Sequence, residues 1–368
     1  MKSVERAHPW KQSRAAKVLG IQYPIVQGPL GGMSSTALVI EVSNAGGLGS
    51  YGALNLSPAQ ISETVQQIRE GTTRPFAVNL WVSTYDEAAS HMAPEQIQRK
   101  AERTHAYFAE LGLDRPPTPE FQPQPFENQM KALIDARPPI ASFICGIPPA
   151  EILQECRRAG IVTIGTATTE DEAQAIADAG IDLVVASGLE GGGHRGSFLE
   201  PAEASLTGSF ALIPRVADQV SIPVIAAGGI ADARGVVAAF ALGADAVQIG
   251  TAFLVCEGSG ISPLHRDALF SDAAKRTVLS RHFTGRLARG LRNRFVEDME
   301  RSGDAPLPYP LQRALMRPYN QEAHKQGRSD LVTLWAGQAT PLIQHRTATA
   351  LMRSLIDETT QLFEHLAQ

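Results

Sequence analysis

The chain has 368 residues, of which 43% are hydrophobic, 19% charged and 6% aromatic. This composition supplies a sizeable apolar core and excludes a disordered chain, a coiled coil and a collagen-like fibre. Lysine and arginine together number 33 against 38 acidic residues, which gives a net charge of −5 with no long run of one sign. A nucleic-acid-binding surface is not expected, because phosphate neutralisation needs clustered cations.

The three cysteines, Cys145, Cys156 and Cys256, show no paired spacing. They predict neither a disulfide framework nor a zinc site. Residues 1–20 lack the apolar core of a signal peptide, and no stretch approaches the length of a membrane span. The sequence therefore predicts a cytoplasmic protein without membrane contact.

Eight short apolar runs recur along the first 250 residues, and most are bounded by glycine. They are residues 24–27, 48–51, 76–80, 142–145, 161–166, 183–187, 224–227 and 246–250. Most are continuously apolar rather than alternating, which is typical of strands buried on both faces of a parallel sheet.

Helical segments separate these strands, and several end in glycine just before the next strand, as at Gly160, Gly180 and Gly243. Thr169 and Asp232 stand where the N-caps of two such helices are expected. Eight strand–helix units predict an α/β protein with a (β/α)8 TIM barrel. An open doubly wound sheet is the alternative.

Two stretches interrupt the repeat. Residues 83–139 are polar and proline-rich and predict an insertion after strand three with one or two helices. Residues 257–330 are basic and helical and predict an accessory lobe or lid, while residues 331–368 are expected to return as the last barrel helix. The predicted barrel therefore comprises residues 1–256 and 331–368.

Glycine-rich segments follow four of the predicted strands, at the barrel face where active sites gather. They are residues 27–33, 188–196, 228–232 and 250–253. The last two follow strands seven and eight, where barrel enzymes commonly bind a phosphate through backbone N–H groups. Tight turns alone are the simpler explanation, and the pattern does not decide whether the phosphate belongs to a substrate or to a cofactor such as FMN.

His194 is the only one of nine histidines that lies at a strand end within a glycine loop. Because imidazole titrates near neutrality, it is a candidate general base or a hydrogen-bond donor to an anion. A structural hydrogen-bonded histidine is the alternative. No second ligand stands at metal-binding spacing, so no metal site is predicted.

Four arginines form the densest basic cluster of the chain: Arg286, Arg289, Arg292 and Arg294. They indicate either a solvated or subunit-contact surface, as in a homodimer, or a surface that attracts anions into the site.

Several motifs together resemble the nitronate monooxygenase family, formerly called 2-nitropropane dioxygenases. They are residues 24–30, 43–49, 191–196, 226–232 and 243–251, with later matches at 285–295 and 334–338. The resemblance implies an FMN-dependent TIM barrel without metal that oxidises alkyl nitronates with O2 to a carbonyl compound and nitrite. FMN rather than FAD or a nicotinamide also agrees with the two glycine turns after strands seven and eight, which suit one terminal phosphate.

The resemblance assigns roles to individual residues. Gly28, Pro29 and Leu30 would line the flavin ring, and Asn79 would bond its edge. Ser187, Gly191 and Gly192 would contact the cofactor near the ribityl chain. The phosphate would be held by Gly228, Gly229, Gln248, Gly250 and Thr251. His194 matches the family's catalytic histidine, which deprotonates a neutral nitroalkane or binds the nitronate. As a base, it would give a rate on nitroalkanes that rises with pH near its ordinary pKa of about 6.5.

Two related flavin enzymes share this scaffold and provide alternatives. Quinone reductases of the superfamily carry a lysine where this chain has Thr166, and enoyl-thioester reductases carry an aliphatic residue where it has Arg195. Arg195 and residues 335–338 favour the monooxygenases. An NAD(P)H-dependent flavin reductase and a non-catalytic FMN-binding protein remain the other hypotheses, and the presence of His194 argues against the latter.

Overall fold

Eight parallel strands form the centre of the computed structural model, which describes residues 9–119 and 124–368. They are β1 (Ile25–Gln27), β2 (Gly49–Gly52), β3 (Phe76–Trp81), β4 (Ile140–Ile144), β5 (Val162–Ala167), β6 (Leu183–Ser187), β8 (Val224–Ala227) and β9 (Ala246–Ile249). All eight predicted strands are confirmed, each within two residues of its predicted bounds.

The order of the strands is β1-β9-β8-β6-β5-β4-β3-β2. A parallel bridge between Val26 and Leu48 joins the two ends of this order. There, Gln27 N–H donates to the Leu48 carbonyl and Leu48 N–H to the Ile25 carbonyl, both at 2.9 Å. The sheet therefore closes into the predicted TIM barrel rather than remaining open.

The helices of the ring cover the outside of the sheet. They are α2 (Thr36–Asn44), α3 (Pro58–Gly71), α7 (Phe126–Ala136), α8 (Ala150–Arg158), α9 (Glu170–Asp178), α10 (Ser209–Gln219), α11 (Ala233–Ala241) and α16 (Ala348–Leu366). Thr169 and Asp232 cap α9 and α11 with their side-chain oxygens, as the sequence predicted. The last helix, α16, packs between α11 and α2.

Alternate strand residues pack on opposite faces of the sheet. Ala77 and Val185 belong to one apolar cluster with residues of α1 (Arg14–Leu19), whereas Val78 and Val184 pack with Ile61 of α3 in another. Because both faces are covered, the strands are apolar at almost every position.

The insertion after β3 carries three short helices outside the ring: α4 (Glu87–Ser90), α5 (Pro94–Glu102) and α6 (His105–Glu110). Helix α7 also falls within the predicted insertion of residues 83–139, but it packs against α3 and α8 as a ring helix. It does so because Phe126, Met130 and Leu133 form one buried face. Residues 120–123, also part of the predicted insertion, and residues 1–8 lie outside the described ranges.

The region of residues 257–330 is helical, as predicted, at α13 (Pro263–Leu269), α14 (Arg294–Ser302) and α15 (Leu311–Lys325). It also contains two strands that the sequence did not reveal, β10 (Thr277–Ser280) and β11 (Ala288–Leu291). They form an antiparallel sheet in the order β10-β11-β7, where β7 (Gly193–His194) belongs to the loop after β6. The lobe therefore pairs directly with the backbone of the candidate histidine.

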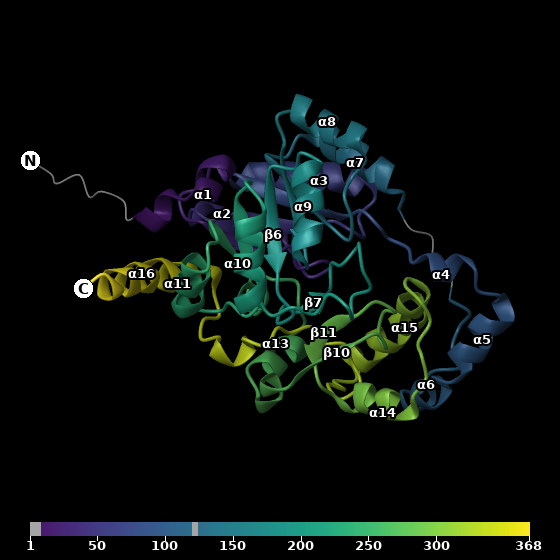
Figure 1. Ribbon diagram of the computed structural model, residues 1–368. Coiled ribbons are helices and arrows are strands. Elements are labelled where there is room, and N and C mark those ends of the chain that lie inside the picture. The colour runs from purple at the N-terminus through teal and green to yellow at the C-terminus, as the bar shows by residue number, and fades with distance from the viewer. Residues whose placement is uncertain (1–8, 120–123) are drawn as a thin grey trace, which may run out of the picture.

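The insertion and this lobe lie side by side (Figure 1). Lys100 of α5 donates to the Ala305 carbonyl at 2.7 Å, and Arg294 of α14 pairs with Glu110 of α6 at 2.5 Å. The remaining elements are η1 (Pro9–Gln12), α12 (Thr251–Leu254), η2 (Asp272–Lys275) and η3 (Thr340–Leu342). Within the described residues, no helix is long and apolar enough to cross a membrane.

Candidate active site

A cavity of about 290 Å³ opens at the carboxyl ends of the barrel strands. Every site residue named from the sequence lines it: Gly28, Pro29, Leu30, Asn79, Ser187, Gly191, Gly192, His194, Gly228, Gly229, Gln248, Gly250 and Thr251. These residues come from five strand ends and converge because parallel strands all end at one face of the barrel.

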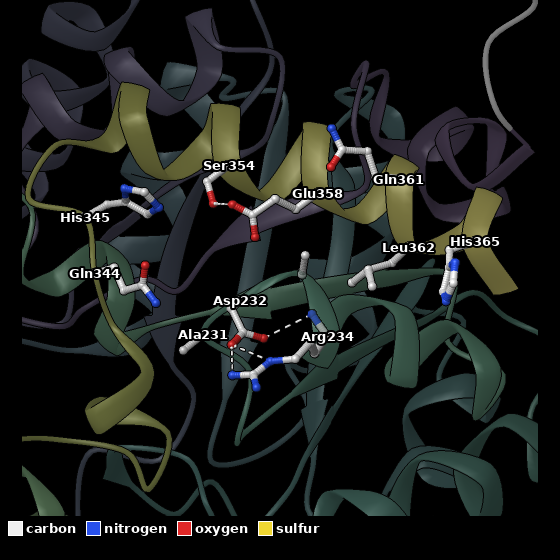
Figure 2. A pocket seen from close by; sticks show the side chains of 11 residues that line it. Ala231, Asp232, Arg234, Gln344, His345, Ser354, Glu358, Gln361, Leu362 and His365 are labelled. Atoms are coloured by element: carbon white, nitrogen blue, oxygen red, sulfur yellow. Dashed lines mark hydrogen bonds and ion pairs between the residues drawn. The ribbon is translucent and has the colours of Figure 1, made fainter.

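A second cavity, of about 540 Å³, lies at the surface between α11 and α16. Figure 2 shows two pairs of its polar side chains bound to each other: Arg234 pairs with Asp232 at 2.5 Å, and Ser354 donates to Glu358 at 2.5 Å. None of the predicted site residues lines it. The cavity at the strand ends is therefore the candidate active site.

Two glycine turns form one wall of the candidate site. Gly228 and Gly229 have φ values of 99° and 72°, which favour glycine. Within the described residues, the backbone N–H groups of Gly229 and Gly250 have no hydrogen-bond acceptor. A Cβ added at Gly250 would meet no heavy atom within 4 Å. Free donors beside open space fit a phosphate group, and binding of a phosphate at this wall stays a prediction.

Asn79 extends from β3 into the same cavity and is 4% exposed. Its amide nitrogen donates to the Ser142 hydroxyl at 3.0 Å and to the Ser142 carbonyl at 3.2 Å. Its amide oxygen accepts no hydrogen bond within the described residues, so it can accept one from a ring N–H of a ligand. Thr166 also lines the cavity.

His194 is the second residue of β7 and pairs with Ala288 of β11. Its Nε2 lies 2.9 Å from the Thr284 hydroxyl of the lobe. Trp81 and Trp335 flank the imidazole, with ring centroids 5.1 and 5.2 Å away. Nδ1 has no hydrogen-bond partner within the described residues, which leaves it for a ligand.

Burial, together with the guanidinium groups of Arg313 and Arg286, lowers the pKa of His194 to about 3. Desolvation and nearby positive charges both disfavour imidazolium. The value of about 6.5 given from the sequence holds for an unperturbed imidazole, and this environment shifts it down, so we expect a neutral ring at physiological pH. The sequence could not show this shift, since both arginines approach from the lobe.

The four clustered arginines do not act together. Arg286 pairs with Asp86 at 2.7 Å, and Arg292 binds Glu297 at 2.7 Å. Arg294 binds Glu110 and Asp330, while Arg289 donates to the Leu189 carbonyl at 3.0 Å. Each therefore has a separate partner within the described residues. The two functions considered from the sequence, a solvated or subunit-contact surface and anion attraction, stay predictions.

Arg313 of α15 is a site residue that the sequence did not indicate. Within the described residues, it is the only lysine or arginine that lines the cavity. Its guanidinium donates to Asn55 at 2.7 Å and to the Tyr309 hydroxyl at 3.1 Å. No local motif marks this position, because the fold alone brings residue 313 to the loop after β2.

Polar groups of the cavity are not arranged to bind a metal. In the described part of the chain, no group of three or more His, Cys, Asp or Glu side chains could hold one. The carboxylate of Glu190 lines the cavity but accepts hydrogen bonds from Ser209 N–H and the Ser209 hydroxyl, at 2.9 and 2.8 Å.

Comparisons with known proteins agree with this geometry. The family model described as nitronate monooxygenase matches residues 12–358. A probable nitronate monooxygenase of Staphylococcus aureus is 38% identical over 97% of this chain and 99% of its own. The solved nitroalkane oxidase of Streptomyces ansochromogenes superposes with a TM-score of 0.87 at 34% identity, over 95% of this chain and 99% of its own. FabK of Thermotoga maritima gives a TM-score of 0.75 at 27% identity, over 96% and 98%.

Proposed function

Since the chain belongs to the nitronate monooxygenase family and is therefore a flavin oxidoreductase, we propose that it uses FMN and O2 to oxidise alkyl nitronates to a carbonyl compound and nitrite. The observation that carries this proposal is the placement of a neutral histidine and a fixed arginine at a glycine-lined cavity.

The cavity residues fit a flavin mononucleotide. The turns at Gly228–Gly229 and at Gly250 would take one terminal phosphate through their free N–H groups. Gly28, Pro29 and Leu30 would line the ring, and the Asn79 amide oxygen would accept a hydrogen bond from its edge. When bound, the flavin supplies the electron transfer that links the organic substrate to O2.

Arg313 favours an anionic substrate. Its charge is fixed by Asn55 and Tyr309, so little reorganisation is needed when an anion binds. A nitronate carries the negative charge that Arg313 attracts, whereas a neutral nitroalkane does not.

His194 acts as a hydrogen-bonding group rather than as a strong base. A base whose pKa is about 3 is poorly matched to removing a proton from a weakly acidic carbon at neutral pH. The Thr284 hydroxyl lies closer to His194 Nε2, at 2.9 Å, than to the Arg286 carbonyl, at 3.2 Å. When Thr284 donates to Nε2, the ring proton lies on Nδ1 and can be donated to a nitronate oxygen. When Thr284 donates to the Arg286 carbonyl instead, Nε2–H donates to the Thr284 hydroxyl and Nδ1 is a hydrogen-bond acceptor.

The balanced net reaction consumes two nitronates and one O2. In each nitronate the C=N bond is broken, the carbon takes one oxygen atom from O2, and the nitrogen leaves as nitrite. The protein residues bind and orient the anion, and the surrounding Trp81 and Trp335 rings limit access of water.

An anaerobic mixing experiment tests the proposal. The FMN-loaded protein is mixed with the nitronate of nitroethane and, separately, with NADH or NADPH, while the flavin absorbance is followed. We expect bleaching by the nitronate, and nitrite formation once O2 is admitted. Bleaching by the nicotinamide without a response to the nitronate would show a flavin reductase instead. Heat release of the cofactor and a mass measurement distinguish FMN from FAD.

The division into a barrel of residues 1–256 and 331–368 and a lobe of residues 257–330 stays a prediction, as do the cytoplasmic location and a homodimer.

A further inference from the structure

Two buried arginines bind three consecutive backbone carbonyls in the turn that follows β6. Arg195 donates to the Ser187 carbonyl at 2.9 Å and to the Gly188 carbonyl at 2.6 Å. Arg289 of β11 donates to the next carbonyl, that of Leu189, at 3.0 Å. The turn is therefore held both by Arg195, which follows it in the sequence, and by Arg289 of the lobe.

Both guanidinium groups lie inside the protein without a paired carboxylate. Arg195 and Arg289 are each 4% exposed, and neither forms an ion pair within the described residues. Within the described residues, the Nε atom of Arg195 has no hydrogen-bond partner. Burial lowers the pKa of Arg195 to about 10, so it stays charged at neutral pH. Burying a cation without a direct ion pair is costly. The negative charges of Glu172 and Glu190 offset part of this cost at Arg195, and that of Glu190 does so at Arg289.

The turn joins the cofactor wall to the histidine. It begins at Ser187, contains Gly191 and Gly192, and leads directly to His194, all of which line the cavity. In the same turn, the backbone N–H groups of Glu190 and Gly192 have no acceptors among the described residues. The turn therefore offers donors to the cavity.

We propose that Arg195 and Arg289 are positioning residues that hold residues 187–193, and through them His194, in the geometry that the flavin and the nitronate require. This inference rests on the proposed function. It also gives the lobe a role beyond that of a lid, because Arg289 lies opposite Gly193 in the β7–β11 ladder and fixes a barrel loop from outside the barrel.

Arg289 is the better residue to test, because Arg195 holds three carbonyls and its loss endangers folding. In R289Q the Leu189 carbonyl loses its charged donor. In R289K one ammonium group can still reach that carbonyl, although the second bond, to the Thr277 hydroxyl at 3.1 Å, is lost. R292Q is the matched control, because Arg292 lies directly after β11, is 52% exposed and binds only Glu297 among the described residues.

Three quantities are measured on each FMN-loaded protein: the visible circular dichroism of the flavin, the FMN dissociation constant, and kcat and KM for the nitronate of nitroethane. We expect R289Q to lower kcat by roughly ten- to a hundredfold, as a displaced reacting group does. KM should change less, and the visible dichroism should change. R289K should recover most of kcat, and R292Q should match the wild type.

Wild-type kcat and dichroism in R289Q would overturn the proposal. An equal loss in R289Q and R289K that follows the loss of folded protein would also overturn it, by showing a purely structural role. If R289Q does not fold, R289K and R195K allow the same comparison, because each of these substitutions keeps a positive charge at its position. The dichroism and the FMN affinity do not depend on turnover, so they decide this proposal even if the wild type fails to oxidise the nitronate.

Discussion

Replacement of His194 by glutamine should make the protein less sensitive to acid. The pKa of His194 is lowered to about 3 in the folded protein, whereas an unfolded histidine titrates near about 6.5. Between these two values the unfolded chain binds a proton that the folded protein does not. The free energy of unfolding therefore falls as the pH falls through 6.5.

The size of the effect follows from the two pKa values. A pH of 5.0 lies about 1.5 units below the pKa of the histidine in the unfolded chain. Each unit corresponds to about 1.36 kcal/mol, so at this pH His194 lowers the free energy of unfolding by about 2 kcal/mol. At pH 8.0 the contribution is close to zero. His194→Gln removes the titrating group. Between pH 8.0 and pH 5.0, the free energy of unfolding of this variant should therefore fall by about 2 kcal/mol less than that of the wild type.

Urea unfolding at the two pH values, followed by circular dichroism under conditions where refolding is reversible, measures this difference. His105→Gln is the matched control, because His105 is exposed and its replacement should leave the acid-induced loss at the wild-type value. An equal loss in the wild type and His194→Gln would refute a neutral, desolvated His194 and would restore it as a candidate base at neutral pH.

Two further substitutions test the cofactor wall and the substrate end of the cavity. Gly250→Ala should fold normally, because Gly250 has a φ of −96° and its Cβ would meet no heavy atom within 4 Å, but the methyl group should weaken FMN binding in a fluorescence titration. Unchanged affinity would place the phosphate elsewhere. Arg313→Gln should raise KM for a nitronate by roughly ten- to a hundredfold, since a hydrogen bond to a charged group contributes about 1.5–3 kcal/mol. Steady-state kinetics measure this change, and Arg317→Gln, on the exposed face of α15, is the control. An unchanged KM would show that Arg313 only holds Asn55 and Tyr309 in place.

The barrel and its cofactor wall were predictable from local sequence. A strand buried on both faces must be apolar throughout, so each strand could be recognised from the run itself without its neighbours. Glycine turns after strands are also local signals, because positive φ at Gly228 and Gly229 and close backbone approach depend on the residue at that position. The family resemblance then placed Asn79, Ser187 and Gln248, which no local pattern would have singled out, at the same cavity.

The chemistry of the histidine was decided by the tertiary structure. His194 and Thr284 are 90 positions apart, and Arg313 reaches Asn55 across 258 positions. The pairing of β7 with β11 and the partners of the clustered arginines likewise join distant segments. A pKa depends on which charges and how much solvent surround a group, and this environment exists only after the lobe has folded onto the barrel. The sequence by itself thus determined a flavin barrel with a histidine at its strand ends, while the fold determined that this histidine is neutral and faces a fixed positive charge.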